Sequence, residues 1–167
     1  MKAIVAVDRN WGIGCQGKLL AHIPEDMKYF KEKTLGKVVV MGRETFDSLP
    51  GQKPLPDRTN IVLTGNPDYD AACSTCSSMD AALERLKDYT DEEIYIIGGE
   101  QIYRQFLPYC DEIYVTKMDD SFPCDKYFPN LDHQYDWQLT EAGPIKEHNG
   151  LKYQFTKYSK GMEKWIK

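Results

Sequence analysis

The stretch LLAHIPEDMKYFKEK, residues 19–33, predicts an amphipathic helix that begins at Pro24. Proline suits the first turn of a helix, because its missing N–H would have no partner there. Met27 and Phe30 then form an apolar stripe at helical spacing. Asp26 stands four residues before Phe30, so the helix places a carboxylate on its apolar side.

Asp26 has two interpretations at this point. The first is an ordinary acid of the first helical turn, favoured by the positive end of the helix dipole. The second is a half-buried acid at the floor of a pocket, with a pKa raised by desolvation and a geometry suited to a planar cationic or amidine-like ligand. The helix alone leaves both open, and the rest of the chain must decide between them.

The composition indicates a single folded domain. The chain has 167 residues, of which 41% are hydrophobic, and this suffices for one core. The net charge of −5 argues against a basic surface for nucleic acid. We find no charged leader with an apolar region, and the apolar runs are too short to span a bilayer. We therefore expect a soluble monomer with a domain over residues 1–160 and a C-terminal extension over 161–167.

The cysteines also bear on compartment and metal binding. The chain has five of them, at positions 15, 73, 76, 110 and 124. An odd count without a secretion signal predicts reduced thiols in the cytoplasm. Cys73 and Cys76 form a C-x-x-C pattern, but no second pair or nearby histidine accompanies it. A structural zinc site needs four ligands, so we expect no metal.

A glycine-rich segment follows the first predicted strand, residues 2–8. It reads GIGCQG over residues 12–17, a complete G-x-G-x-x-G pattern. In a dinucleotide-binding fingerprint the helix begins at these glycines. Here the next helix cannot begin before Pro24, so we reject that interpretation. We instead predict a long, glycine-hinged loop over residues 9–23, which suits an active-site lid.

The remaining chain alternates strands and helices. Strand-like runs cover residues 37–41, 58–64, 94–97 and 112–118, with a further short strand near 73–76. Helical patterns cover residues 42–49, 79–89 and 100–107, with Ser78 as the cap of the second. Asn149-Gly150 between two β-rich runs is a strong hairpin signal. This order predicts an α/β fold with a mostly parallel sheet, helices on its faces and a C-terminal antiparallel hairpin.

Two of the predicted helices begin directly after a buried strand. One start offers free N–H groups with Arg43 and Thr45, and the other offers the glycine pair Gly98-Gly99. Together they suit a cofactor that carries a pyrophosphate. The strand over residues 58–64 ends on the neutral Thr64, where NAD sites often hold an acid, and this favours NADP.

Taken in order, these motifs resemble those of a bacterial dihydrofolate reductase over nearly the whole chain. Any one of them is weak, but their order and spacing are specific. The matching pieces are AVD at 6–8 with Ile13-Gly14, IPEDMKYF at 23–30, VMGRETF at 40–46, PLPDRTN at 54–60, IGG at 97–99 through Tyr103, and Thr116 followed by the acidic and aromatic stretch 122–128.

The resemblance implies an eight-stranded sheet and NADPH-dependent reduction of 7,8-dihydrofolate to tetrahydrofolate. Asp26 would pair with the amino group and ring nitrogen of the pterin, with Thr116 bonded behind it as the second catalytic residue. Arg58 would clamp the glutamate α-carboxylate of the substrate. The other implied substrate-binding residues are Ile4, Val5, Ala6, Leu19, Met27, Phe30, Leu49, Leu55, Ile97 and Tyr103.

The implied NADPH site overlaps this set. A cis peptide would join Gly98 to Gly99, and Tyr103 would lie near the nicotinamide. The implied cofactor-binding residues are Ala6, Ile13, Gly14, Gly17, Leu19, Gly42, Arg43, Thr45, Leu63, Thr64, Gly98, Gly99, Gln101, Ile102 and Tyr103. Antifolates would be further small-molecule ligands.

The chain departs from the family at two places. Leu20-Ala21 stands where many relatives carry Pro-Trp, and Gln101 where some place an arginine for the 2′-phosphate. No side chain in the motifs is an obvious proton donor to pterin N5, so we expect Asp26 to polarise the pterin while a water delivers the proton. The alternatives are a reductase of the same fold that acts on a pyrimidine such as a riboflavin precursor, and an inactive pterin-binding module.

Overall fold

The computed structural model describes residues 1–66, 68–69 and 71–161. Apart from its first residue, the predicted extension over 161–167 lies outside the described residues. The α-helices are α1 (Pro24–Thr34), α2 (Arg43–Asp47), α3 (Met79–Leu86) and α4 (Glu100–Phe106). The strands are β1 (Lys2–Val7), β2 (Gly12–Gly14), β3 (Val38–Gly42), β4 (Thr59–Leu63), β5 (Ser74–Cys76), β6 (Ile94–Gly98), β7 (Glu112–Met118), β8 (Lys126–Tyr127), β9 (Trp137–Ala142), β10 (Lys146–His148) and β11 (Leu151–Lys160).

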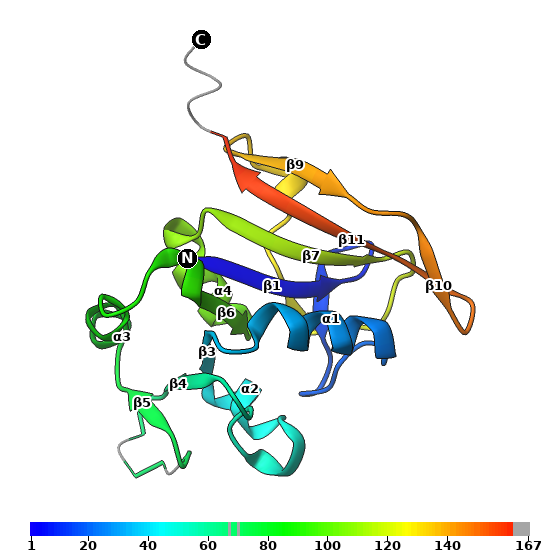
Figure 1. Cartoon of the computed structure of the whole chain (residues 1–167). Coiled ribbons are helices and arrows are strands. Elements are labelled where there is room, and N and C mark those ends of the chain that lie inside the picture. Colours follow the sequence, from blue (N-terminus) through cyan, green and yellow to red (C-terminus); the bar gives the residue numbers. More distant parts are fainter. Residues whose placement is uncertain (67, 70, 162–167) are drawn as a thin grey trace.

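One twisted sheet forms the centre of the molecule (Figure 1). Eight strands follow one another in the order β10-β11-β7-β1-β6-β3-β4-β5, and β9 also pairs with β11. The pairs from β7 to β5 are parallel, whereas β11 runs antiparallel to β7, β9 and β10. The predicted fold class, mostly parallel with an antiparallel C-terminal hairpin, is confirmed.

Helices cover both faces of this sheet, because the buried strands are apolar on both sides. Val38 and Val40 of β3 pack in the same cluster as residues of α3 and α4. Val39 and Met41 of the same strand pack in a second cluster that includes Phe30 of α1 and Phe46 of α2. The alternation of side chains along a strand therefore divides the core into two layers.

The turns between elements follow the sequence signals closely. Asn149 and Gly150 both have positive φ, at 50° and 82°, which is the combination that a tight hairpin turn requires. Ser78 accepts a hydrogen bond from the N–H of Ala81 at 3.1 Å and thereby caps α3. The helices α3 and α4 end at Leu86 and Phe106, shortly before the predicted ends.

Two predictions about the first thirty residues need correction. The segment 9–23 is not loop throughout, because β2 within it pairs with β8, and the short length of both strands explains why no pattern was visible. Met27 is 45% exposed, so it does not belong to the buried stripe of α1. The face of α1 that packs on the sheet is instead marked by Tyr29, Phe30 and Thr34.

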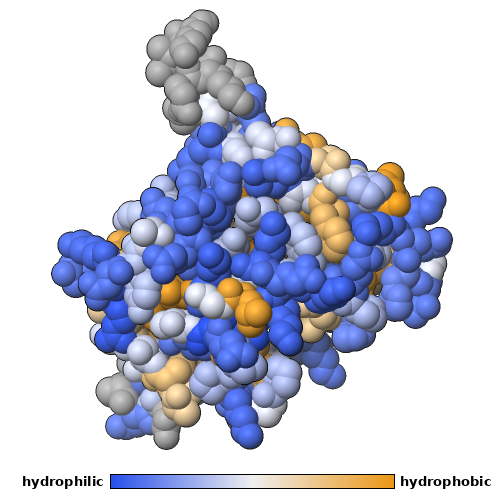
Figure 2. Space-filling model, in the orientation of Figure 1, coloured by the Kyte–Doolittle hydropathy of each residue, from blue (hydrophilic) through white to orange (hydrophobic). Residues whose placement is uncertain are grey.

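One face of the described chain is mainly polar. Figure 2 shows a largely hydrophilic face on which apolar residues lie in small separate groups, as in ordinary globular proteins. None of the helices in the described part is both long and apolar enough to cross a membrane.

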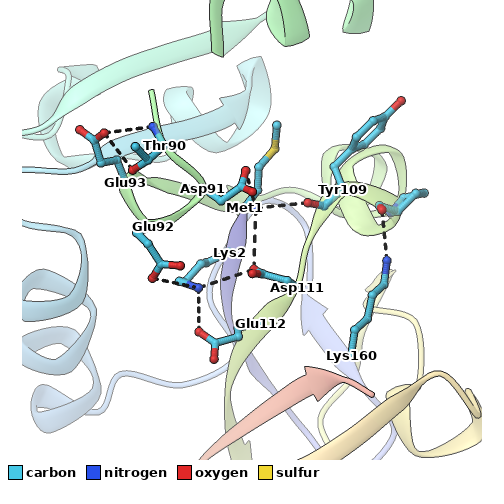
Figure 3. A network of polar contacts seen from close by, with 11 residues as sticks. Met1, Lys2, Thr90, Asp91, Glu92, Glu93, Tyr109, Asp111, Glu112 and Lys160 are labelled. Atoms are coloured by element: carbon cyan, nitrogen blue, oxygen red, sulfur yellow. Dashed lines mark hydrogen bonds and ion pairs between the residues drawn. The ribbon is translucent and has the colours of Figure 1, made fainter. Parts of the chain in front are cut away.

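A network of charges holds the start of β1 (Figure 3). The side chain of Lys2 is only 4% exposed, and its Nζ lies 2.7 Å from Glu112, 3.4 Å from Glu92 and 3.5 Å from Asp111. Burial alone would lower the pKa of Lys2, but the hydrogen bond to Glu112 and the charges of the carboxylates raise it above its ordinary value. The hydrogen bond from Lys2 in turn lowers the pKa of Glu112.

We predict that Lys2→Met lowers the free energy of unfolding by about 2–3 kcal/mol, because it leaves clustered carboxylates without their buried cation. The folded-state pKa of Glu112 is depressed, so its stabilising effect is present above its unfolded pKa and is lost as the pH falls through the folded value. The variant should therefore lose less stability on acidification than the wild type. Chemical denaturation between pH 3 and pH 7 measures both effects, and Lys28→Met, on a 77% exposed lysine, is the control. Equal losses in the two variants would contradict the prediction.

Candidate active site

A partly buried hydrogen bond between α1 and the sheet forms the centre of the site. The hydroxyl of Thr116 on β7 donates to Oδ1 of Asp26 at 2.7 Å. In the sheet register Thr116 lies opposite Ala6 of β1, so the strand that bonds this carboxylate is itself paired with β1 at that point. Burial raises the pKa of Asp26 above its ordinary value, and the hydrogen bond from Thr116 offsets only part of this. Of the two interpretations of Asp26, the geometry supports the half-buried acid.

A line of residues runs from Asp26 along the face of α1 that meets the sheet. Asp26, Phe30 and Thr34 are spaced by four residues, so they lie one above another over about 12 Å. At the far end Nη1 of Arg58 donates to Thr34 Oγ1 at 3.1 Å, and its Nε donates to the carbonyl of Pro56 at 2.9 Å. A carboxylate and a guanidinium therefore mark the two ends of one helix face. Burial lowers the pKa of Arg58, but its ordinary value is far above neutrality and the group stays charged.

Apolar residues predicted to bind the substrate divide into three groups in the structure. Ile4, Phe30, Leu49, Leu55 and Ile97 share the cluster beneath α1 and α2. Val5 and Tyr103 belong to the cluster on the opposite face of the sheet, and Ala6 packs with Leu20 and Ala21 in a third cluster. The hydroxyl of Tyr103 donates to the carbonyl of Ile4 at 2.7 Å and links the first two groups. Leu19 is 68% exposed and, like Met27, lies in none of the clusters.

The two predicted helix starts lie side by side. The strands β3 and β6 are neighbours, and α2 and α4 begin directly beyond their carboxyl ends. A cis peptide joins Gly98 to Gly99, as the sequence resemblance predicts. A Cβ added to either glycine would come within 3.4 Å of Thr45 Oγ1 in α2, so the two turns are in close contact. Crevices of this kind, outside the carboxyl ends of parallel strands, are the usual ligand sites of α/β sheets.

The other predicted cofactor residues surround this crevice. Leu63, the last residue of β4, lies opposite Gly42 in the register, and Thr64 follows it. Gly42 contacts Ile102, because a Cβ at Gly42 would lie 3.1 Å from its side chain. Gln101 is exposed on the first turn of α4. Ile13, Gly14 and Gly17 come from the segment between β1 and α1, and Ile13 packs against the cluster that contains Ile102 and Tyr103.

Arg43 is held at the start of α2 by its neighbours. Its Nε lies 4.0 Å from Asp47, and its guanidinium lies 5.8 Å from the centre of the Tyr69 ring. Tyr69 donates its hydroxyl proton to Asp47. Burial, followed by the bond to Asp47, raises the pKa of Tyr69 to about 12, so the phenol stays neutral at physiological pH. Sequence reasoning missed Tyr69 because it lies in an irregular segment.

Asp8 connects the segment 9–23 to the segment that contains β8. Its Oδ1 accepts the N–H of Asn10 at 2.9 Å and of Gly12 at 2.8 Å, and its Oδ2 accepts the N–H of Phe122 at 3.0 Å. The thiol of Cys124 donates to Oδ2 at 3.4 Å. Burial alone would raise the pKa of Asp8, but the backbone N–H groups outweigh it and hold the pKa below its ordinary value. The signal in the sequence was an aspartate at the end of a strand, before a glycine-rich segment.

Further out, Asp125 holds the same two segments together. Its backbone N–H donates to the carbonyl of Gly14 at 3.0 Å, and its side chain accepts the N–H of Gln16 at 2.9 Å. The candidate lid is therefore closed onto the chain around β8. No group of three or more metal-ligating side chains occurs among the described residues.

Comparison with known proteins agrees with this site. A family model described as dihydrofolate reductase matches residues 1–160. The chain is 40% identical to the dihydrofolate reductase of Bacillus subtilis, over 94% of this chain and 92% of the relative. It is 41% identical to the dihydrofolate reductase of Neisseria meningitidis serogroup B, over 93% and 94% of the two chains. A solved structure of dihydrofolate reductase from Enterococcus faecalis, complexed with NADP(H) and RAB-propyl, matches with a TM-score of 0.84 and 36% identity over 96% and 95% of the two chains.

The chain therefore belongs to the dihydrofolate reductase family and is an enzyme of that type. The same similarity extends to the bifunctional dihydrofolate reductase-thymidylate synthase of Daucus carota, at 38% identity, but there the chain matches only 33% of the relative.

We predict that Asp8→Asn destabilises the protein by about 2–3 kcal/mol, since one acceptor oxygen is replaced by an amide that faces backbone donors. The amide hydrogens of Gly12 and Phe122 should exchange faster in the variant, because both donate to Asp8. Denaturation and hydrogen exchange measure the two effects. Asp119→Asn removes the same charge from a 59% exposed site and should change stability by less than about 0.5 kcal/mol. Unchanged exchange at both amides would refute the role of Asp8 as the link between the two segments.

Proposed function

We propose that the chain reduces 7,8-dihydrofolate to 5,6,7,8-tetrahydrofolate with NADPH as the cofactor. The observation that carries this proposal is the half-buried Asp26, hydrogen bonded to Thr116, in a chain of the dihydrofolate reductase family. A carboxylate in this setting suits recognition of a flat heterocycle that presents an amino group beside a ring nitrogen. The proposed site therefore begins at the first turn of α1.

The proposed substrate lies along α1. Asp26 binds the pterin, Phe30, Leu49 and Leu55 contact its rings, and Arg58 binds the glutamate α-carboxylate as a bidentate pair. The spacing of about 12 Å from Asp26 to Thr34, which holds Arg58, supports this orientation. A substrate without an acidic tail would leave Arg58 without a role. This distinguishes the proposal from a reductase that acts on a pyrimidine.

The proposed cofactor site is the crevice between β3 and β6. When bound, NADPH supplies the hydride. Gly98 and Gly99 leave backbone accessible where a side chain would meet Thr45, and this fits close approach of a phosphate-bearing group. Arg43 and Thr64 offer a cation and a hydroxyl for the 2′-phosphate. The bound NADP(H) of the Enterococcus faecalis relative supports the choice of cofactor.

In the proposed mechanism Asp26 holds and polarises the pterin, and Thr116 fixes the orientation of its carboxylate. Because burial already raises the pKa of Asp26, the group responds to pH nearer neutrality than an exposed aspartate would. A water delivers the proton to pterin N5. The segment 9–23 excludes bulk solvent from the reacting atoms.

We propose that the protein acts as a monomer in the cytoplasm. Cys15, Cys76, Cys110 and Cys124 are free thiols, which supports a reducing compartment. The family match over residues 1–160 supports one catalytic domain, with residues 161–167 as an extension.

We predict that Asp26→Asn lowers kcat at pH 7 by about 100-fold or more, the usual scale for loss of an acid–base group, while dihydrofolate still binds. The amide keeps the shape of the side chain, so thermal unfolding should show a folded variant. NADPH oxidation measures turnover, and fluorescence quenching measures substrate binding. Glu32→Gln, on a 63% exposed acid of the same helix, is the control. Near-normal turnover of Asp26→Asn would contradict the proposed role of Asp26 in catalysis.

We also predict that Arg43→Gln lowers kcat/KM for NADPH by about tenfold, because a charge-assisted bond to the 2′-phosphate is lost. The value for NADH, which lacks that phosphate, should not change. Arg104→Gln is a matched control, since Arg104 is 47% exposed against 48% for Arg43 and pairs with an acid of its own helix in the same way. A loss with both cofactors alike would argue against recognition of the 2′-phosphate by Arg43.

A further inference from the structure

The C-terminal hairpin is hydrogen bonded to the first turn of α1. Glu25, the residue before Asp26, accepts a hydrogen bond from Nζ of Lys146 at 2.6 Å and from the hydroxyl of Tyr153 at 3.1 Å. Lys146 belongs to β10 and Tyr153 to β11, and the two residues are paired in the hairpin register. The N-terminus of α1 has no side-chain cap of its own. The bonds from Lys146 and Tyr153 therefore fix the first turn of a helix that has no capping side chain of its own.

A stacked aromatic pair adds a second contact one turn further along. The rings of Tyr29 in α1 and Phe155 in β11 lie 4.2 Å apart at an angle of 16°. Phe155 is also opposite Thr116 in the register of β11 and β7. The hairpin thus contacts α1 on both sides of Asp26 and is paired with the strand that carries its hydrogen-bond donor.

The contact between the hairpin and the first turn of α1 bears on the ionisation of Asp26 through the charges around it. Glu25 is a second carboxylate and directly precedes Asp26 in the chain, and the hydrogen bond from Lys146 lowers the pKa of Glu25, so it is ionised. The other titratable groups of this region are Lys28 and Tyr29 of α1 and Tyr153 of β11; β1 and β7 offer the neutral Ala6 and Thr116. Lys146 is the cation hydrogen bonded to Glu25, and the charge of Lys28 also acts on that carboxylate.

We propose that Lys146 and Tyr153 are positioning residues for Asp26, acting by neutralising and fixing the Glu25 carboxylate beside it. The inference rests on the proposed function, in which Asp26 binds the pterin. Lys146 keeps the charge of Glu25 from acting on Asp26, and Tyr153 keeps the first turn of α1 in register with β7. Neither residue touches the substrate.

The proposal gives opposite signs for two substitutions. Lys146→Met leaves Glu25 as an uncompensated negative charge, which disfavours ionisation of Asp26 and raises its pKa by roughly half a unit, the scale for a like charge nearby in water. Glu25→Gln removes that charge. Glu25→Gln alone leaves Lys146 as an uncompensated cation and lowers the pKa of Asp26, so the double variant Glu25→Gln with Lys146→Met, which lacks both charges, should return that pKa close to the wild-type value.

The experiment follows the carboxyl carbon of Asp26 by NMR through a pH titration of the full chain without ligands. The pH profile of kcat is then recorded for the same variants. We expect both to shift upward in Lys146→Met, downward in Glu25→Gln, and to lie close to the wild type in the double variant. Lys87→Met, which breaks a 2.8 Å ion pair with Glu84 on α3, is the matched control and should shift neither. An equal shift of the Asp26 pKa from the wild type in Lys146→Met and in the double variant, or no shift in Lys146→Met, would overturn the charge effect.

Tyr153→Phe separates position from charge. It removes one hydrogen bond to Glu25 and leaves the charges in place, so kcat should fall more than KM changes while the pKa of Asp26 moves less than in Lys146→Met. An unchanged kcat would remove Tyr153 from the proposal. The NMR titration needs no turnover, so it tests the positioning residues even if Asp26→Asn were to retain activity and the proposed role of Asp26 failed.

Discussion

The hydrogen bond from Thr116 to Asp26 joins the first helix to the central sheet at a point that water reaches poorly. A carboxylate in such a place is costly unless it is bonded, and Thr116 satisfies one of its two oxygens. The other oxygen has no protein donor in the described chain that would compete with a ligand. The fold thus maintains a partly desolvated acid, and this requires α1, β1 and β7 to keep their relative positions. Lys146, Tyr153 and Phe155 of the antiparallel hairpin contact α1. The strand β7 pairs with β1 on one side and with β11 on the other.

The crevice for the cofactor has a different origin. It follows from the order of the strands, since β3 and β6 are neighbours although more than fifty residues separate them. Each of these strands ends on a glycine, and a helix begins shortly after it. Glycine at these turns lets the backbone itself line the crevice. The acid comes from a helix and the crevice from strand ends, so the two halves of the site rest on separate parts of the architecture. Tyr103 connects them, because its ring lies against Gly98 and its hydroxyl binds the carbonyl of Ile4.

Much of this architecture could be predicted from the sequence, because buried parallel strands are apolar throughout and leave clear marks such as Val38–Gly42. The cap at Ser78 and the turn at Asn149 carried equally direct signals. Other features depend on partners distant in the chain. The strands β2 and β8 are too short for any periodicity, and the exposure of Met27 depends on how α1 lies on the sheet. Contacts such as Lys146 with Glu25 join residues more than a hundred positions apart, and a single sequence carries no trace of them.

The place of β1 in the sheet has a consequence for how the chain acquires its structure. This strand pairs on one side with β6 and on the other with β7, so Lys2 lies beside Tyr95 and Glu112. During synthesis, therefore, the first strand emerges long before either neighbour exists. Its apolar side chains stay unpaired with the sheet until more than half of the protein has been made. The sheet is therefore completed late in folding. An N-terminal fragment that ends before β6 lacks both pairing partners of β1.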